Sequence, residues 1–199
     1  IYNAPDEKFA PISNSAKSDS RDKFTDGNHY HLFVGSLHPR KNINGMLKAH
    51  NEYRKLGGRS DLLVVGTKMW KEEQKNAEGV HWAGRLEDND LVSAIGGANA
   101  LLYLPFFEGF GVPVVEAMAC GVPVVASNTS SLPEVCGGAA AALVNPIDYI
   151  GAANALLDLE KNKDLLMEKS NAGIKRASEF SWDKSAAKFS EIISEVLSR

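Results

Sequence analysis

Short apolar runs alternate with amphipathic stretches along most of the chain. The apolar runs have the length and composition of β-strands and fall at residues 30–35, 61–66, 80–84, 100–104, 122–126 and 140–144. Each run is followed by a stretch compatible with a helix, as at residues 43–50, where apolar side chains recur at helical spacing. This rhythm predicts an α/β fold with a Rossmann-like, doubly wound parallel sheet of about six strands.

The two ends of the chain depart from this rhythm. After Pro146 the pattern is wholly helical, over residues 150–159, 163–178 and 182–197, and predicts a C-terminal helical tail. Residues 6–28 are polar with little apolar periodicity, which favours a linker or surface loop. We therefore expect a linker segment over residues 1–29 and one domain over residues 30–199. The chain starts with Ile1 and has no signal peptide, so we expect a piece of a longer protein whose N-terminal domain is missing here.

The chemically distinctive residues follow the carboxyl ends of the predicted strands. They lie at residues 36–42, 67–68, 85–86, 105–111 and 127–132. In open parallel sheets, ligands bind in the crevice beyond the carboxyl ends of the strands. The pattern therefore predicts one ligand site at this edge of the sheet.

The segment after the fourth predicted strand suits an anion. It passes through Gly109 and Gly111 and enters a helix with Pro113 in its first turn. Glycine lets the backbone approach a ligand closely, and proline is favoured at a helix start because its missing N–H would be unsatisfied there. Free N–H groups at a helix start bind anions, so we expect a diphosphate here. Phe106 and Phe107 are expected to pack under this loop.

Charged side chains surround the predicted anion site. Glu108 and Glu116 flank the loop, and because a carboxylate facing a phosphate would repel it, each is expected to point aside and accept hydrogen bonds from sugar or ribose hydroxyls. Arg40 and Lys41 follow the first strand, with Asn42 as a candidate helix cap. A guanidinium and an ammonium at this edge suit a pyrophosphate leaving group.

The run from Glu108 to Glu116 resembles the E-x7-E motif of the retaining glycosyltransferases of family 4 (group 1), which have the GT-B fold. Residues 119–127, Ala-Cys-Gly-Val-Pro-Val-Val-Ala-Ser, and residues 131–134, Ser-Leu-Pro-Glu, match the same family. The resemblance covers roughly Tyr30 to the C-terminus and implies the C-terminal, nucleotide-sugar-binding half of a GT-B fold. It implies that Glu108 holds hydroxyls of the donor hexose, that Glu116 holds the ribose hydroxyls, and that the Phe110 and Gly111 N–H groups contact the distal phosphate.

The family's G-R-L-x-x-x-K pattern corresponds to Gly35 through Lys41, with one departure. Lys41 falls on the lysine of the pattern, but Ser36 replaces its arginine, so one phosphate contact expected from the family is missing and Arg40 is the candidate replacement. In family members the nucleotide base contacts the backbone that follows the third strand. In this chain that backbone is at Arg85 and Leu86. We thus expect catalytic roles for Glu108, Lys41 and, by hypothesis, Arg40. We expect donor binding by Glu116, Gly109, Phe110, Gly111, Arg85, Leu86 and Ser36.

The implied reaction transfers a hexose from a nucleotide-diphosphate sugar to a saccharide or lipid-linked acceptor with retention of configuration. It requires neither a metal nor another cofactor, and it favours a cytoplasmic enzyme of polysaccharide biosynthesis. The acceptor site would belong to the missing N-terminal domain, so this chain alone is expected to be weakly active or inactive. The sugar, the base, the acceptor and a peripheral membrane location of the full-length protein stay open. A related GT-B epimerase or phosphorylase and a non-catalytic nucleotide-binding module are the alternatives.

Composition excludes several other classes. The net charge is −3 and Lys and Arg are scattered, which disfavours nucleic acid as a partner. Cys120 and Cys136 are too few and too far apart for a zinc site or redox pair, and are expected to be buried thiols. The sequence Asp88-Asn89-Asp90 spells D-x-D, but we expect a helix cap with Asp88 at the N-cap rather than a metal site. No apolar run approaches the roughly 20 residues of a membrane helix.

Overall fold

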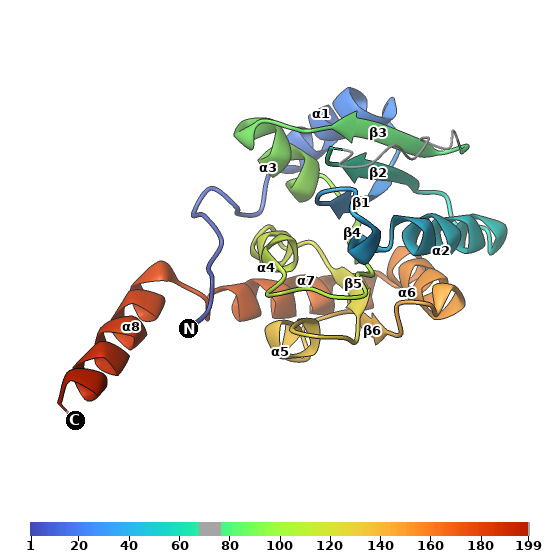
Figure 1. The fold of residues 1–199 in the computed structure, drawn as a ribbon. Helices are drawn as coiled ribbons and strands as arrows, with labels where there is room; N and C mark the ends of the chain where they lie inside the picture. Colours follow the sequence, from blue (N-terminus) through green and yellow to red (C-terminus); the bar gives the residue numbers. More distant parts are fainter. Residues whose placement is uncertain (68–76, 199) are drawn as a thin grey trace.

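The computed structural model describes residues 1–67 and 77–198 and has a parallel sheet at its centre (Figure 1). The sheet has six strands in the order β3-β2-β1-β4-β5-β6. They are β1 (Tyr30–Val34), β2 (Asp61–Val65), β3 (Val80–Gly84), β4 (Ala100–Tyr103), β5 (Val124–Ser127) and β6 (Ala142–Val144). Every neighbouring pair is parallel, which confirms the predicted doubly wound fold class. The loop position Lys68 and the helix expected between β2 and β3 fall on residues 68–76, outside the described residues.

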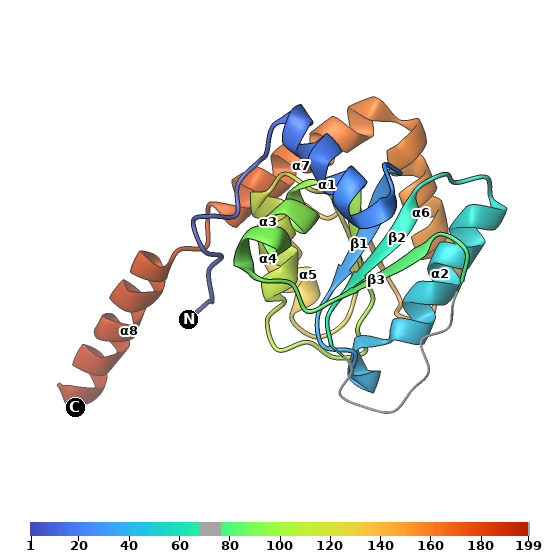
Figure 2. The ribbon, with the colours of Figure 1, turned by 90° about the horizontal axis from the view of Figure 1, so that it is seen from above.

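Helices cover both faces of the sheet (Figure 2). Helices α2 (Ile43–Lys55) and α6 (Tyr149–Lys161) pack against each other on one face. The other face carries α3 (Asp88–Gly96), α4 (Val112–Ala119) and the short α5 (Leu132–Cys136), and α7 (Lys163–Ala177) packs along α4. Because both faces are covered, every residue of β1, β2, β4 and β5 is buried. This burial explains why those strands appear in the sequence as continuous apolar runs.

The polar N-terminal segment contains a helix, which corrects the expectation of a linker or surface loop over residues 6–28. Helix α1 (Asn14–Thr25) begins at the cap Ser13, whose Oγ accepts from Ala16 N at 3.2 Å. Its buried side chains are those of Ser20 and Thr25, and Ser20 Oγ donates to the carbonyl oxygen of Ser93 in α3 at 2.8 Å. The helix escaped the hydrophobic pattern because the residues it buries are hydroxylated rather than apolar.

The C-terminal helical tail is confirmed. Helices α6, α7 and α8 (Trp182–Leu197) follow β6, and α8 extends away from the sheet without a buried residue (Figures 1 and 2). Its apolar side chains are therefore exposed, among them Trp182, Phe189, Ile193 and Val196. Within residues 1–67 and 77–198, no helix combines the length and the apolar character needed to cross a membrane.

Candidate functional site

The order of the strands along the sheet reverses between β1 and β4. The loops that leave the carboxyl ends of these two strands lie side by side, since Phe106 N donates to Arg40 O at 2.8 Å. Doubly wound sheets bind ligands at such a reversal point, where the crossovers on either side leave a crevice. The predicted loops at residues 36–42 and 105–111 therefore meet where a ligand is expected.

Asn42 fixes the first of these loops. A single 3-10 turn, η1 (Pro39–Lys41), ends at Asn42, whose backbone is left-handed with φ 56°. Its Oδ1 accepts from Gly45 N at 3.1 Å, which confirms the predicted cap of α2. Its Nδ2 donates to Leu104 O at 2.9 Å and to Pro146 O at 2.8 Å. By bridging these segments, Asn42 sets the direction in which the preceding Lys41 side chain leaves the backbone.

Lys41, Tyr103 and Glu108 form a closed polar cluster at the reversal point. Lys41 is 5% exposed, and its Nζ contacts the Glu108 carboxylate and the Tyr103 hydroxyl. Tyr103 donates to Glu108 Oε2 at 2.6 Å. Burial opposes ionisation of Glu108, but the hydrogen bonds from Lys41 and Tyr103 outweigh it, and the pKa of the carboxyl lies below its usual value. The site thus holds a preformed charged pair whose desolvation these hydrogen bonds offset.

Arg40 borders the same cluster from the solvent side. Its Nη1 lies 3.9 Å from Glu108 Oε1 and donates to Phe107 O at 3.3 Å, and its side chain is 43% exposed. Ser36 is half-buried on the same loop, where its carbonyl oxygen accepts from His38 N at 2.8 Å. The structure therefore brings Arg40, Lys41 and Glu108 together, while their roles toward a donor stay predictions.

The loop from Glu108 to Gly111 leaves several N–H groups unsatisfied. Gly111 is the N-cap of α4 with φ 101°, and Pro113 lies in the first turn as predicted. The N–H groups of Phe110, Gly111 and Val112 have no acceptor within the described part of the chain. Gly109 N donates to Glu108 Oε1 at 3.2 Å. This helix start has the unsatisfied donors that an anion needs.

Serines, rather than phenylalanines, support this loop. Ser130 Oγ accepts from Glu108 N at 3.0 Å, and Ser131 Oγ lies 3.0 Å from both carbonyl oxygens of Glu108 and Phe110, to which it donates. Phe106 and Phe107 are 49% and 61% exposed. The expectation that they pack under the loop is wrong, because side-chain hydrogen bonds from the β5–α5 loop hold it instead.

Glu116, in α4, carries a carboxylate without a hydrogen bond to any described residue. Burial raises its pKa to about 7, the nearby charge of Lys8 opposes the shift, and the charges of Asp6 and Asp88 add to it. Lys8 Nζ in turn lies 2.6 Å from Asp88 Oδ2. A half-buried carboxylate without a hydrogen-bond donor is poorly stabilised, and hydroxyl donors from a ligand would stabilise it.

Arg85 and Leu86 lead from β3 into α3. Arg85 is exposed and its charge acts on Asp88, while Leu86 packs against the hydrophobic core. The expected cap at Asp88 is corrected: Glu87 is the N-cap of α3 and makes no side-chain capping bond. Asp88 and Asp90 pair with Lys8 and Lys23 at 2.6 Å each, lysines from the N-terminal segment that a local pattern does not reveal. Within the described ranges, no group of three His, Cys, Asp or Glu side chains could hold a metal ion.

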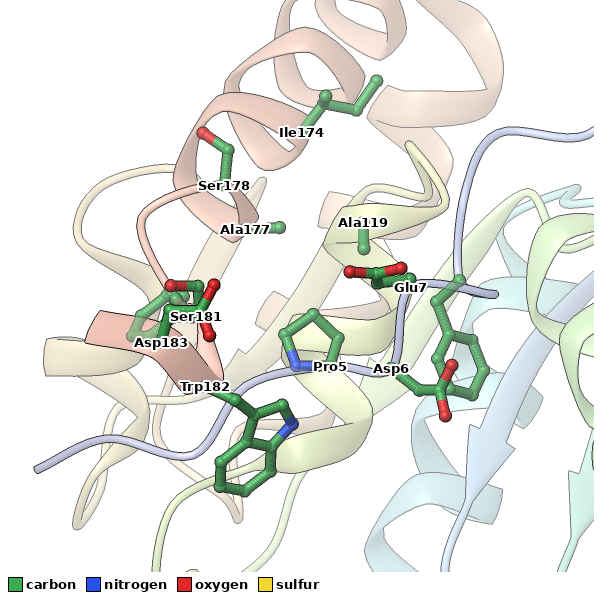
Figure 3. A pocket seen from close by; sticks show the side chains of 12 residues that line it. Pro5, Asp6, Glu7, Ala119, Ile174, Ala177, Ser178, Ser181, Trp182 and Asp183 are labelled. Atoms are coloured by element: carbon green, nitrogen blue, oxygen red, sulfur yellow. The ribbon is translucent and has the colours of Figure 1, made fainter. Parts of the chain in front are cut away.

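The N-terminal segment also borders a cavity of about 340 Å3 at the far end of α4. Figure 3 shows its wall, with Pro5 and Asp6 from the segment, Ala119 from α4 and Trp182 from α8. No predicted site residue lines this cavity. The N-terminal segment therefore acts on Glu116 through the charge of Lys8. Its Pro5 and Asp6 face the end of α7 and the start of α8 across this cavity.

Sequence reasoning missed Tyr103 and Lys8. Tyr103 ends β4 within a predicted apolar strand, and a hydroxyl at the carboxyl end of a central strand is the signal that points to it. Lys8 lies in the predicted linker segment and carries no local signal. Cys120 and Cys136 are free and buried, as expected.

Comparisons with known proteins give the family and the fold of the chain. The family model described as glycosyl transferases group 1 matches residues 15–179. The chain is 39% identical over 168 residues to the O-antigen chain mannosyltransferase B of Escherichia coli, a match that covers 77% of this chain and 42% of that protein. It therefore spans less than half the length of this relative.

Solved structures share the fold. The UDP-glucose complex of Anabaena Alr3699/HepE superposes with a TM-score of 0.82 and 21% identity, over 98% of this chain and 57% of that one. The C-terminal domain of the Francisella tularensis group 1 glycosyl transferase LpcC superposes with a TM-score of 0.76 and 20% identity, over 89% of this chain and 97% of that one. The fold is thus that of the C-terminal domain of a GT-B protein, and with the family match over most of its length the chain belongs to the glycosyl transferases of group 1.

Proposed function

We propose that this chain is the donor-binding half of a retaining hexosyltransferase that uses a nucleotide-diphosphate sugar. The observation that carries the proposal is the charged pair of Lys41 and Glu108 beside the unsatisfied N–H groups of residues 110–112, at the reversal point of the sheet. A diphosphate needs cations and N–H donors, and a sugar needs a hydroxyl acceptor. This edge of the sheet offers a cation in Lys41, N–H donors at residues 110–112 and a hydrogen-bond acceptor in Glu108.

The cluster divides naturally into two chemical roles. Lys41, Arg40 and the N–H groups of the loop stabilise the charge that grows on the distal phosphate as the glycosidic bond breaks. Glu108 is ionised and accepts hydrogen bonds from hydroxyls of the hexose, which orients the anomeric carbon. These roles need no metal ion.

The remaining predicted residues extend the site toward the nucleoside. Glu116 accepts hydrogen bonds from the ribose hydroxyls, and the backbone at Arg85 and Leu86 contacts the nucleotide base. Gly109 and Ser36 lie on the loops that enclose the diphosphate. Lys8 joins this part of the site, because its charge acts on Glu116.

The donor sugar that we favour is mannose, because the Escherichia coli relative is a mannosyltransferase. The Anabaena structure contains UDP-glucose, so the base and the sugar both need a direct test. The acceptor, a saccharide or a lipid-linked glycan, would bind a further domain of the same protein. We therefore propose a cytoplasmic donor-binding unit that transfers little sugar by itself.

Calorimetric titration of the chain with GDP, UDP and ADP tests the proposal. We expect saturable binding of one nucleotide, weakened about tenfold or more by Glu116→Ala because ribose hydroxyls lose their charged acceptor. Glu191→Ala, at an exposed glutamate of α8, is the control and should bind as the parent does. If neither this chain nor the full-length protein binds any of the three nucleotides, the proposal is wrong.

A further inference from the structure

Tyr103 is a neutral side chain that contacts both members of the charged pair, Lys41 and Glu108. It is the last residue of β4, at the reversal point of the sheet, and it is fully buried. Its ring stacks on Phe33 of β1 with centroids 5.9 Å apart and an interplanar angle of 26°. A tyrosine has only two side-chain torsions, so this packing leaves its hydroxyl little freedom to move.

The hydroxyl donates one hydrogen bond and accepts another, one with each member of the charged pair. It donates to Glu108 Oε2 at 2.6 Å and accepts from Lys41 Nζ. Lys41 also contacts Glu108 directly, so the three polar groups close a ring of hydrogen bonds. A phenol carries one proton and two lone pairs, which makes it suited to join an ammonium to a carboxylate.

The two flexible members of the ring depend on this rigid one. Lys41 has a four-carbon stem and Glu108 lies in a loop, and both lose rotamer freedom when they are held in one place. The other contacts of Glu108 come from Arg40 at 3.9 Å and from Gly109 N at 3.2 Å, and both reach Oε1 rather than Oε2. Tyr103 and Lys41 therefore hold one carboxylate oxygen while the other stays on the side of the loop and Arg40.

We infer that Tyr103 is a positioning residue of the donor site, whose hydroxyl holds Lys41 and Glu108 in the geometry that receives a nucleotide sugar. The inference rests on the proposed function for the identity of the ligand, although the hydrogen-bonded ring itself does not. Tyr103 acts through its two partners and needs no contact with the donor.

The variant that tests this role is Tyr103→Phe, which keeps the ring packed on Phe33 and removes only the hydroxyl. The matched control is Tyr53→Phe in α2, because Tyr53 is equally buried and its hydroxyl also bonds a carboxylate, that of Glu160. Both variants lose a buried hydroxyl beside a carboxylate, so any general loss of stability should be similar. Only Tyr103→Phe should weaken binding of the nucleotide sugar, by about tenfold, since hydrogen bonds to charged groups are the strong ones.

A second readout needs no ligand. Carboxyl-detected NMR titration, with the Glu108 resonance assigned by Glu108→Gln, should show a higher pKa for Glu108 in Tyr103→Phe than in the parent, because one donor to the carboxylate is lost. A merely structural tyrosine would leave this pKa unchanged, and that result overturns the inference whether or not a nucleotide binds. Loss of nucleotide binding in Glu116→Ala together with normal binding in Tyr103→Phe would retain the proposed function and reject the role of Tyr103.

Discussion

At the scale of the residue, Glu108 and Glu116 show how the same side chain acquires opposite properties from its surroundings. Hydrogen bonds from Lys41 and Tyr103 overcome burial and lower the pKa of Glu108. Glu116 is half-buried without a hydrogen bond to a described residue, and its pKa rises to about 7. The first carboxylate is therefore ready as an anion, whereas the second becomes fully charged only above neutral pH or with a ligand.

We predict that nucleotide affinity depends on pH through Glu116. Hydroxyl donors bind a carboxylate more strongly than a protonated carboxyl, so binding should lower the pKa of Glu116 and release a proton. Affinity should then fall as the pH falls, by about tenfold between pH 8 and pH 6, the window set by a pKa of about 7. Calorimetric titration in buffers of different ionisation enthalpy measures both the affinity and the released proton.

Glu116→Gln should flatten this pH profile, because the amide does not titrate. Glu191→Gln, on the exposed face of α8, should retain it. An unchanged profile in Glu116→Gln would assign the titration to another group and remove the ribose role from Glu116.

At the scale of the element, the turn from β4 into α4 depends on two glycines with different requirements. Gly111 has a left-handed backbone with φ 101°, and a Cβ there would lie 2.6 Å from Leu132 Cδ2. Gly109 has no left-handed backbone, and a Cβ there would meet nothing within 4 Å. The sequence alone presents the two glycines as equivalent, whereas the structure makes only Gly111 indispensable to the turn.

We predict that Gly111→Ala lowers the free energy of unfolding by about 2 kcal/mol or more, from the cost of a left-handed alanine together with the contact with Leu132. The N–H groups of residues 110–112 should shift with the turn, so nucleotide affinity should fall as well. Gly109→Ala is the matched control and should change the free energy of unfolding by less than about 0.5 kcal/mol. Urea unfolding monitored by circular dichroism measures both, and equal losses in the two variants would contradict the explanation.

The buried strands and helix α6 could be predicted from sequence because the residues that they bury are apolar. The strand β2 is buried along its whole length, and α6 buries alanines and leucines at helical spacing. Helix α1 could not be predicted in this way, because it buries Ser20 and Thr25, whose hydroxyls find hydrogen-bond partners only in the folded chain. The pattern of apolar positions therefore detects helices that bury apolar side chains and misses helices, such as α1, that bury hydroxylated ones.

The candidate site divides along the same line. Lys41, Glu108 and Glu116 follow motifs with fixed spacing, and the structure brings Lys41 and Glu108 into contact. Tyr103 lies on a buried strand and Lys8 on the N-terminal segment, and their contacts with Glu108 and Asp88 cannot be inferred before the tertiary fold is known. Contacts between segments far apart in the chain are what local patterns cannot supply.

At the scale of the whole molecule, the fold buries two histidines on the side of the sheet covered by α2. His31 and His50 are 1% and 2% exposed, and their rings lie 4.7 Å and 6.0 Å from that of Tyr53. Burial lowers the pKa of His31 to about 3, with the charge of His50 adding to the shift, and burial lowers the pKa of His50 to about 4. Both imidazoles are therefore neutral in the folded chain under conditions that protonate them in the unfolded chain.

We predict that these histidines make the fold sensitive to acid. An unfolded histidine takes up its proton near pH 6.5, whereas the folded chain resists until about pH 4 or 3, so the unfolded chain binds more protons between these values. The contribution of each histidine to the free energy of unfolding should fall by about 1.4 kcal/mol per pH unit below pH 6.5. Glu116 acts in the opposite sense between about pH 7 and its unfolded value, because its folded pKa is raised, so one carboxyl offsets part of the effect of two imidazoles. Urea unfolding at pH 7, 6 and 5 measures how the free energy of unfolding changes with pH. As the pH falls, this free energy should decrease less in His31→Gln and in His50→Gln than in the parent. The control His29→Gln, at an exposed histidine, should follow the parent. If both buried variants keep the parent slope, the acid sensitivity arises elsewhere in the chain and the burial of these imidazoles does not control it.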